Sequence, residues 1–161
     1  MKFPSVFINH GGGPLPLMGR QPELVENMRE VVRKFLPPKP PKAIVVISAH
    51  WEADPIQITS AERPKMYYDY YNFPAETYKY EYPAPGSPDL ASKIKNLLEG
   101  QNLKSELDDS RGFDHGVFIP LMIMYPEVST YHNMDVCAHI NGSKSSLCMI
   151  TFIRRISQWC V

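Results

Sequence analysis

Two histidines each end a run of residues that is typical of a buried β-strand. His10 ends the run Ser-Val-Phe-Ile-Asn-His, and His50 ends the run Ala-Ile-Val-Val-Ile-Ser-Ala-His. In α/β proteins, ligands bind in the crevice at the carboxyl ends of parallel strands. Two imidazoles brought to that edge by neighbouring strands can share one divalent ion, although a single histidine at a strand end is more often just a hydrogen-bonded side chain. Their shared position favours a metal site formed by His10 and His50.

The residues that follow the two histidines suggest supporting roles. Trp51 and Glu52 could support His50 without binding the metal themselves. Glu52 is also a candidate metal carboxylate, but its closeness to His50 in sequence makes shared coordination awkward. The glycines at 11–13 are not part of a G-x-G-x-x-G or Gly-Lys-Ser/Thr motif, and the chain has no G-x-S-x-G motif to pair with them as an esterase oxyanion loop. We expect them to let the backbone turn sharply beside the metal and to leave room for substrate.

The apolar pattern predicts strands alternating with helices. Strands are expected at 6–8, 43–47 and 56–59, and an amphipathic helix is expected over 23–36. A second helix should begin after Ser87, which can cap it, with Pro88 in the first turn. This alternation indicates an α/β fold with a largely parallel sheet and helices on both faces.

Residues 63–86 are rich in tyrosine and proline without a clean period, so we expect a long ordered loop there. Its aromatic side chains could line a pocket for an aromatic ring, but packing over the sheet is the better interpretation for most of them. The residues concerned are Tyr67, Tyr68, Tyr70, Tyr71, Phe73, Tyr78, Tyr80 and Tyr82.

Composition narrows the class of protein. The 161 residues suit one domain, and the formal net charge is zero with no basic run, so we expect no binding to nucleic acid. No apolar run approaches the length of a bilayer span and no signal peptide is evident, so we expect no membrane partner and a cytoplasmic protein that acts on a small molecule.

The composition changes after residue 127. All sixteen prolines lie at or before Pro126, whereas the three cysteines all lie after it, at a spacing that does not suit a zinc site. We therefore predict an N-terminal unit over 1–127 and an unrelated tail over 128–161 that is not a domain. The tail has enough apolar residues for one strand or helix, namely Leu147, Met149, Ile150, Phe152, Ile153 and Ile156.

Four segments, FINHGGGP, VVISAHWE, YPAPGSPDLA and GFDHGVFIPLMIMYPE, occur in order across residues 3–127. Together they resemble the LigB-type extradiol catechol dioxygenases, in particular the 4,5-DOPA dioxygenase branch. The resemblance implies metal-dependent ring cleavage of a catechol such as DOPA by dioxygen. Family members carry a second half of comparable size, so we expect a chain truncated relative to the family.

The resemblance also implies roles for individual residues. His10 and His50 would be metal ligands for Fe(II) or Zn(II), while the remaining ligand lies in the missing half. His115 matches an active-site histidine outside the metal's coordination shell, which would hydrogen-bond substrate or oxygen and move a proton. The alternative for His115 is a histidine at a helix start that pairs with a carboxylate such as Asp114. His132-Asn133 is similar to a later His-Asn pair of the family only superficially.

The predicted function is thus extradiol ring cleavage, with alternatives from other classes. The main alternative is a catalytically inactive truncated product that binds metal weakly or pairs with a partner chain, and a homo-oligomer is compatible with either. A metal-dependent hydrolase is less supported, because no cluster of acidic ligands is apparent. Residues that bind the substrate are not predicted.

Overall fold

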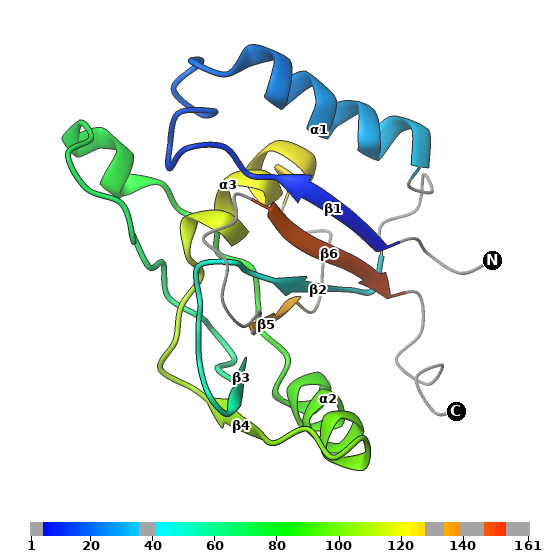
Figure 1. The fold of residues 1–161 in the computed structure, drawn as a ribbon. Coiled ribbons are helices and arrows are strands. Elements are labelled where there is room, and N and C mark those ends of the chain that lie inside the picture. The colour runs from blue at the N-terminus through cyan, green and yellow to red at the C-terminus, as the bar shows by residue number, and fades with distance from the viewer. Residues whose placement is uncertain (1–4, 36–40, 128–133, 139–146, 154–161) are drawn as a thin grey trace.

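The structure is a computed structural model that describes residues 5–35, 41–127, 134–138 and 147–153. Its centre is a six-stranded sheet with the strand order β1-β6-β2-β5-β3-β4 (Figure 1). The strands are β1 (Ser5–Asn9), β2 (Ala43–Ile47), β3 (Ile56–Thr59), β4 (Ser105–Asp108), β5 (Met134–Ala138) and β6 (Leu147–Ile153).

The sheet contains both parallel and antiparallel pairs. β2 pairs with β5 and β3 pairs with β4 in parallel, whereas β6 is antiparallel to both β1 and β2, and β5 is antiparallel to β3. The predicted α/β class with parallel strand pairs is confirmed, but every antiparallel pair involves β5 or β6, so the sheet is mixed. β6 lies between β1 and β2 and is antiparallel to both, so β1 and β2 run in the same direction although they are not neighbours.

In the described parts of the chain, three α-helices and one short 3-10 helix accompany the sheet. They are α1 (Pro22–Phe35), η1 (Ala75–Lys79), α2 (Pro88–Gly100) and α3 (His115–Met124). The Ser87 hydroxyl accepts a hydrogen bond from the Leu90 backbone N–H at 3.3 Å, which confirms the predicted cap of α2. η1 lies within the segment predicted as a loop, so that prediction is corrected at five residues.

Helices cover both faces of the sheet, as predicted. Successive side chains of β2 point to opposite faces and pack against different helices. Ile44 and Val46 pack in the cluster that contains α3 and the buried Met28 of α1. Ala43 and Val45 point the other way and pack against α2. Figure 1 shows α1 and α3 together near β1, with α2 beside β3 and β4. Nine of the ten residues of α3 are buried, which explains why its sequence is apolar on every side.

Two strands from the segment expected to be foreign lie inside the sheet. β6 coincides with the apolar run for which the sequence predicts a strand or a helix, while β5 and β4 were not expected. The division at residue 127 stays a prediction, but these two strands form part of the same sheet as the rest of the chain. Among the described residues, no helix is both long and apolar enough to span a membrane.

Candidate metal centre

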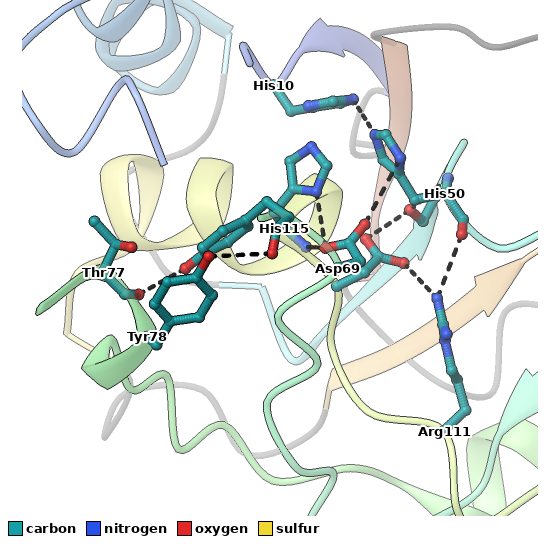
Figure 2. Close-up of polar contacts among 10 residues, drawn as sticks. His10, His50, Asp69, Thr77, Tyr78, Arg111 and His115 are labelled. Carbon is teal, nitrogen blue, oxygen red and sulfur yellow. Dashed lines mark hydrogen bonds and ion pairs between the residues drawn. The ribbon is translucent and has the colours of Figure 1, made fainter. Parts of the chain in front are cut away.

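The structure brings His10 and His50 into contact at the edge of the sheet. Their Nε2 atoms lie 2.9 Å apart, although the two residues follow strands that are not neighbours (Figure 2). The predicted proximity is therefore correct, and the predicted adjacency of the strands is wrong. Both strands run in the same direction, so their carboxyl ends lie at the same edge, and the two side chains span the end of the intervening strand.

His115 is the third imidazole of this group. It is the first residue of α3, and its ring centroid lies 4.9 Å from that of His10 and 4.1 Å from that of His50. One nitrogen from each of the three rings can be chosen so that all lie within 4.8 Å of one another. Within the described part of the chain, these three histidines are the group of ligand side chains with the spacing to hold a metal ion.

The carboxylate next to His115 is Asp69, a residue that sequence reasoning missed. Its Oδ1 accepts a hydrogen bond from the His115 backbone N–H at 2.9 Å and lies 2.8 Å from the His115 Nδ1. Its Oδ2 lies 3.7 Å from the His50 Nδ1. The sequence does hold one signal, because Asp69 is the only acidic residue between Glu62 and Glu76 and is flanked on each side by two tyrosines.

Asp114, the carboxylate that the sequence suggested as the partner of His115, has a different role. It precedes α3 but makes no side-chain capping bond. Its oxygens accept hydrogen bonds from the Ser48 hydroxyl at 2.8 Å and from the Arg111 guanidinium at 3.2 Å. Burial raises the pKa of Asp114, and the hydrogen bond from Ser48 and the charge of Arg111 oppose that shift. Asp114 therefore forms polar contacts with Ser48 and Arg111 and is not the carboxylate that pairs with His115.

Arg111 links this polar contact to the aromatic residues nearby. Its guanidinium donates a hydrogen bond to the His50 carbonyl at 3.4 Å. It lies 4.0 Å from the ring centroid of Tyr67 and 5.2 Å from that of Trp51. These contacts are cation–π interactions, so Arg111 joins Trp51 to the backbone of His50, while a supporting role of Trp51 toward the His50 side chain stays a prediction. Glu52 is exposed and is not among the residues grouped as possible ligands.

A short backbone bridge brings Asp69 to the start of α3. The Phe113 N–H donates to the Lys65 carbonyl at 2.8 Å, and the Tyr67 N–H donates to the Phe113 carbonyl at 2.8 Å. A Cβ on Gly112 would overlap the Lys65 carbonyl oxygen, so only glycine allows the two segments to approach this closely. The bridge fixes Asp69 and His115 two or three residues beyond it on either side.

Burial and crowding keep His10 and His50 neutral. Burial lowers the pKa of His10 to about 4, and the neighbouring His115 and His50 contribute to that shift. Burial also lowers the pKa of His50, with His115 as the next cause. Burial would raise the pKa of Asp69, but the hydrogen bonds from the His115 side chain and backbone outweigh it and lower the pKa overall. At neutral pH the centre therefore combines the neutral imidazoles of His10 and His50 with one carboxylate.

The donor set and its spacing fit a divalent metal ion. Two nitrogens that each bind an ion at about 2.1 Å lie about 3 Å apart when the angle between the bonds is near 90°. The observed separation of 2.9 Å between the Nε2 atoms of His10 and His50 agrees with this geometry. Imidazole suits zinc, copper, iron and nickel, so the residues do not select one metal by ligand type alone.

The sequence also made predictions for the glycines after His10, for the tyrosine-rich loop and for histidines late in the chain. Gly11 and Gly13 have φ angles of 82° and 55°, which confirms a sharp turn directly after His10. Tyr70 and Tyr82 are buried, and their hydroxyls donate to the carbonyls of Thr77 and Tyr125, as expected for packing (Figure 2 includes the contact to Thr77). His132, Asn133 and His139 lie outside the described residues.

Comparison with known proteins identifies the family. Residues 5–145 match the family described as the catalytic LigB subunit of aromatic ring-opening dioxygenase, so the match extends past the boundary expected at residue 127. A protein of Beta vulgaris named 4,5-DOPA dioxygenase extradiol is 40% identical over 143 residues, which is 86% of this chain and 52% of that protein. A protein of the same name from Portulaca grandiflora is 34% identical, over 88% of this chain and 54% of that protein.

A solved structure agrees with these matches. The crystal structure of an uncharacterized protein from Escherichia coli K12 is 30% identical with a TM-score of 0.51, and the match covers 72% of this chain and 40% of that one. The chain spans about half the length of the curated relatives it matches. The sequence match, the shared fold and the cluster of histidines agree with one another. The chain belongs to the LigB family of aromatic ring-opening dioxygenases, a family of oxidoreductases.

Proposed function

We propose that this chain carries the metal-binding part of an extradiol dioxygenase that opens the ring of a catechol such as DOPA with dioxygen. The observation that carries the proposal is the contact between His10 and His50 at 2.9 Å, beside a third imidazole and a carboxylate. The relatives named 4,5-DOPA dioxygenase extradiol support the substrate class. His10 and His50 would hold Fe(II) or Zn(II), which would supply activation of the catechol toward dioxygen.

In this proposal the protein residues hold the ion and handle protons. His10 and His50 bind the ion through Nε2, which requires both imidazoles to be neutral, and their lowered pKa values favour that form. His115 stands in the same group with its Nδ1 against Asp69, so its Nε2 is available for the substrate. It would hydrogen-bond the catechol or oxygen and move a proton there.

The spacing of the three imidazoles also supports a second assignment, in which His115 is a third ligand. The variant His115→Ala separates the two roles. If His115 acts on substrate, the variant keeps its metal content and loses turnover. Equal loss of metal and turnover would make His115 a ligand. His10→Ala, which removes a proposed ligand, is the positive control for metal loss.

A second candidate function is a form that binds metal weakly, has little or no ring-cleaving activity, and pairs with another chain, including a second copy of itself. The group of possible ligands in the described residues consists of imidazoles without a carboxylate, and the matched relatives are about twice as long. Three neutral ligands leave the charge of a divalent ion largely uncompensated. For either function, we propose that the protein is located in the cytoplasm.

Oxygen uptake with a catechol tests the proposal. The purified chain, loaded with Fe(II) or Zn(II), should consume oxygen and form a yellow ring-opened product from DOPA, and the His10→Ala variant should not. Stoichiometric metal with no oxygen uptake would favour the inactive form. Failure to bind either metal would contradict both candidates. Size-exclusion chromatography of the same sample would reveal pairing.

A further inference from the structure

We propose that Asp69 is a positioning residue that fixes the tautomers of both His115 and His50. Its carboxylate would hold the proton of each imidazole on Nδ1, which leaves Nε2 without a proton and directed at the shared site. The inference rests on the proposed metal function only for its consequence on metal binding. The arrangement of the tautomers can be tested on the metal-free chain.

The contacts of the two carboxylate oxygens carry the argument. Oδ1 lies 2.8 Å from the His115 Nδ1 and also accepts the His115 backbone N–H at 2.9 Å, while Oδ2 lies 3.7 Å from the His50 Nδ1 (Figure 2). An ionised carboxylate accepts hydrogen bonds and cannot donate them. The 2.8 Å contact therefore requires the proton of a neutral His115 to be on Nδ1. At 3.7 Å the His50 Nδ1 is beyond hydrogen-bond distance, but the negative charge facing it favours the same tautomer, so in both rings Nε2 keeps its lone pair.

Asp69 is better suited to this role than to direct coordination. Oδ1 is already engaged by two donors from His115, and the group with the spacing to hold an ion contains the three histidines without Asp69. The other nearby carboxylate, Asp114, is engaged by Ser48 and Arg111. Among the described side chains, Asp69 is therefore the acidic group that contacts the imidazoles from the side away from the shared site.

The surroundings of Asp69 hold its carboxylate in place. It accepts the first backbone N–H of α3, where the helix dipole stabilises a negative charge. The bridge between Lys65 and Phe113 fixes the backbone a few residues away on both segments. Histidines that bind metals usually donate their other ring N–H to such a carboxylate, and losing it commonly weakens metal binding about 10- to 100-fold.

Two substitutions separate the contributions of the two oxygens. Asp69→Ala removes both acceptors. Asp69→Asn keeps a carbonyl that can accept from His115 but replaces the negative oxygen that faces His50 with an amide N–H, which no longer favours a proton on the His50 Nδ1. Asp109→Asn is the matched control, because Asp109 is exposed on the loop that leads to α3.

The tautomers are read from ¹⁵N-histidine NMR spectra of the metal-free chain at about pH 8, where free histidine is neutral. We expect Nδ1–H on His115 and His50 both in the wild type and in the Asp109→Asn control. Asp69→Asn should change the tautomer of His50 alone, and Asp69→Ala should change both. Titration with Zn(II) against a competing chelator should show about a 10- to 100-fold weaker affinity for both Asp69→Ala and Asp69→Asn, because both variants change the tautomer of the proposed ligand His50, and no loss for the control.

Unchanged tautomers in Asp69→Ala would overturn the inference, as would unfolding of both Asp69 variants, which would make the residue purely structural. Circular dichroism reports that unfolding. A wild-type chain that shows both Nδ1–H tautomers, loses them in Asp69→Ala and yet binds no Zn(II) would support the positioning role and contradict the proposed metal function. The failure of one claim is thereby distinguished from the failure of the other.

Discussion

The two sides of this molecule are held together in different ways. On one side, α2 packs on β2 and β3 through a small aliphatic cluster, which we call the α2 region, made of Ala43, Val45, Ile58, Leu90, Ala91 and Ile94. On the other side is the histidine region, made of His10, His50, Asp69 and His115, where polar contacts join residues far apart in the sequence. The α2 region gains its stability from apolar burial, whereas the histidine region places charged and polar groups where burial is unfavourable.

This difference predicts which substitutions should affect stability alone and which should also affect metal affinity. Substitutions in the α2 region should lower the free energy of unfolding and leave metal affinity unchanged. Substitutions in the histidine region, or in the backbone that supports it, should change metal affinity as well. The predictions for Gly112, Leu90 and Ser87 measure both quantities, because a change in the wrong one would remove the distinction.

The largest effect is expected for Gly112→Ala. The new Cβ would overlap the Lys65 carbonyl and displace the bridge that sets Asp69 against His115. We expect a loss of roughly 4 kcal/mol in the free energy of unfolding, measured by chemical denaturation, together with weaker Zn(II) binding. Gly100→Ala is the control, because a Cβ at Gly100 meets no atom within 4 Å. A bridge variant with wild-type metal affinity would contradict the proposed link between backbone and site.

Leu90→Ala should have the next largest effect. Leu90 is 2% exposed at the centre of the α2 region, and removing its side chain leaves a cavity. We expect a loss of about 3 kcal/mol in the free energy of unfolding with unchanged Zn(II) affinity. Leu97, which is 37% exposed on the same helix, provides the comparison, since Leu97→Ala should lose less than about 1 kcal/mol. Weaker metal binding by Leu90→Ala would show that the two regions are coupled.

The third prediction concerns the pH dependence of the metal-free chain. The pKa of His10 is lowered to about 4 in the folded protein, so the unfolded chain takes up the proton first as the pH falls. The contribution of His10 to the free energy of unfolding should be constant above about pH 7 and should fall by roughly 3 kcal/mol between about pH 6.5 and pH 4. Denaturation in the presence of a chelator measures it, and His10→Asn should show a smaller slope. An equal slope in both proteins would refute the assignment to His10.

Ser87→Ala should have the smallest effect. It removes the acceptor for the Leu90 N–H at the start of α2, and the expected loss is about 1 kcal/mol in the free energy of unfolding. Metal affinity should not change. Ser92→Ala on the same helix is the control, because the Ser92 hydroxyl is exposed and bonds only a carbonyl within the helix. A loss as large for Ser92→Ala would mean that the cap is not the cause.

The sequence predicted the α2 region well, because local rules build it. β2 and β3 have the expected bounds, and α2 begins at the expected cap. These elements are specified by runs of β-branched residues, by helical spacing and by a capping serine, all of which can be read over a few residues. The same rules placed α1 within one residue at each end.

The histidine region was predicted only in part. Strand ends identified His10 and His50, and the resemblance to a family identified His115, but Asp69 and the insertion of β6 between β1 and β2 were missed. Asp69 lies in a loop without a period, and its contact with His115 joins residues that are 46 positions apart. Strand order is likewise set by pairing between distant segments, so neither feature follows from the local periodicity of the sequence.

The wide spacing of the site residues along the chain has a consequence for folding. His10 and His50 are 40 positions apart, and Asp69 and His115 are 46 apart, so the centre requires the closure of long loops. The entropy lost on closing such loops must be met before the contacts form, which delays non-local contacts. No short segment of the chain contains the centre, and it forms only when the strand ends and α3 have docked. An ion that binds there would therefore stabilise the completed fold and slow its unfolding without accelerating the early steps of folding.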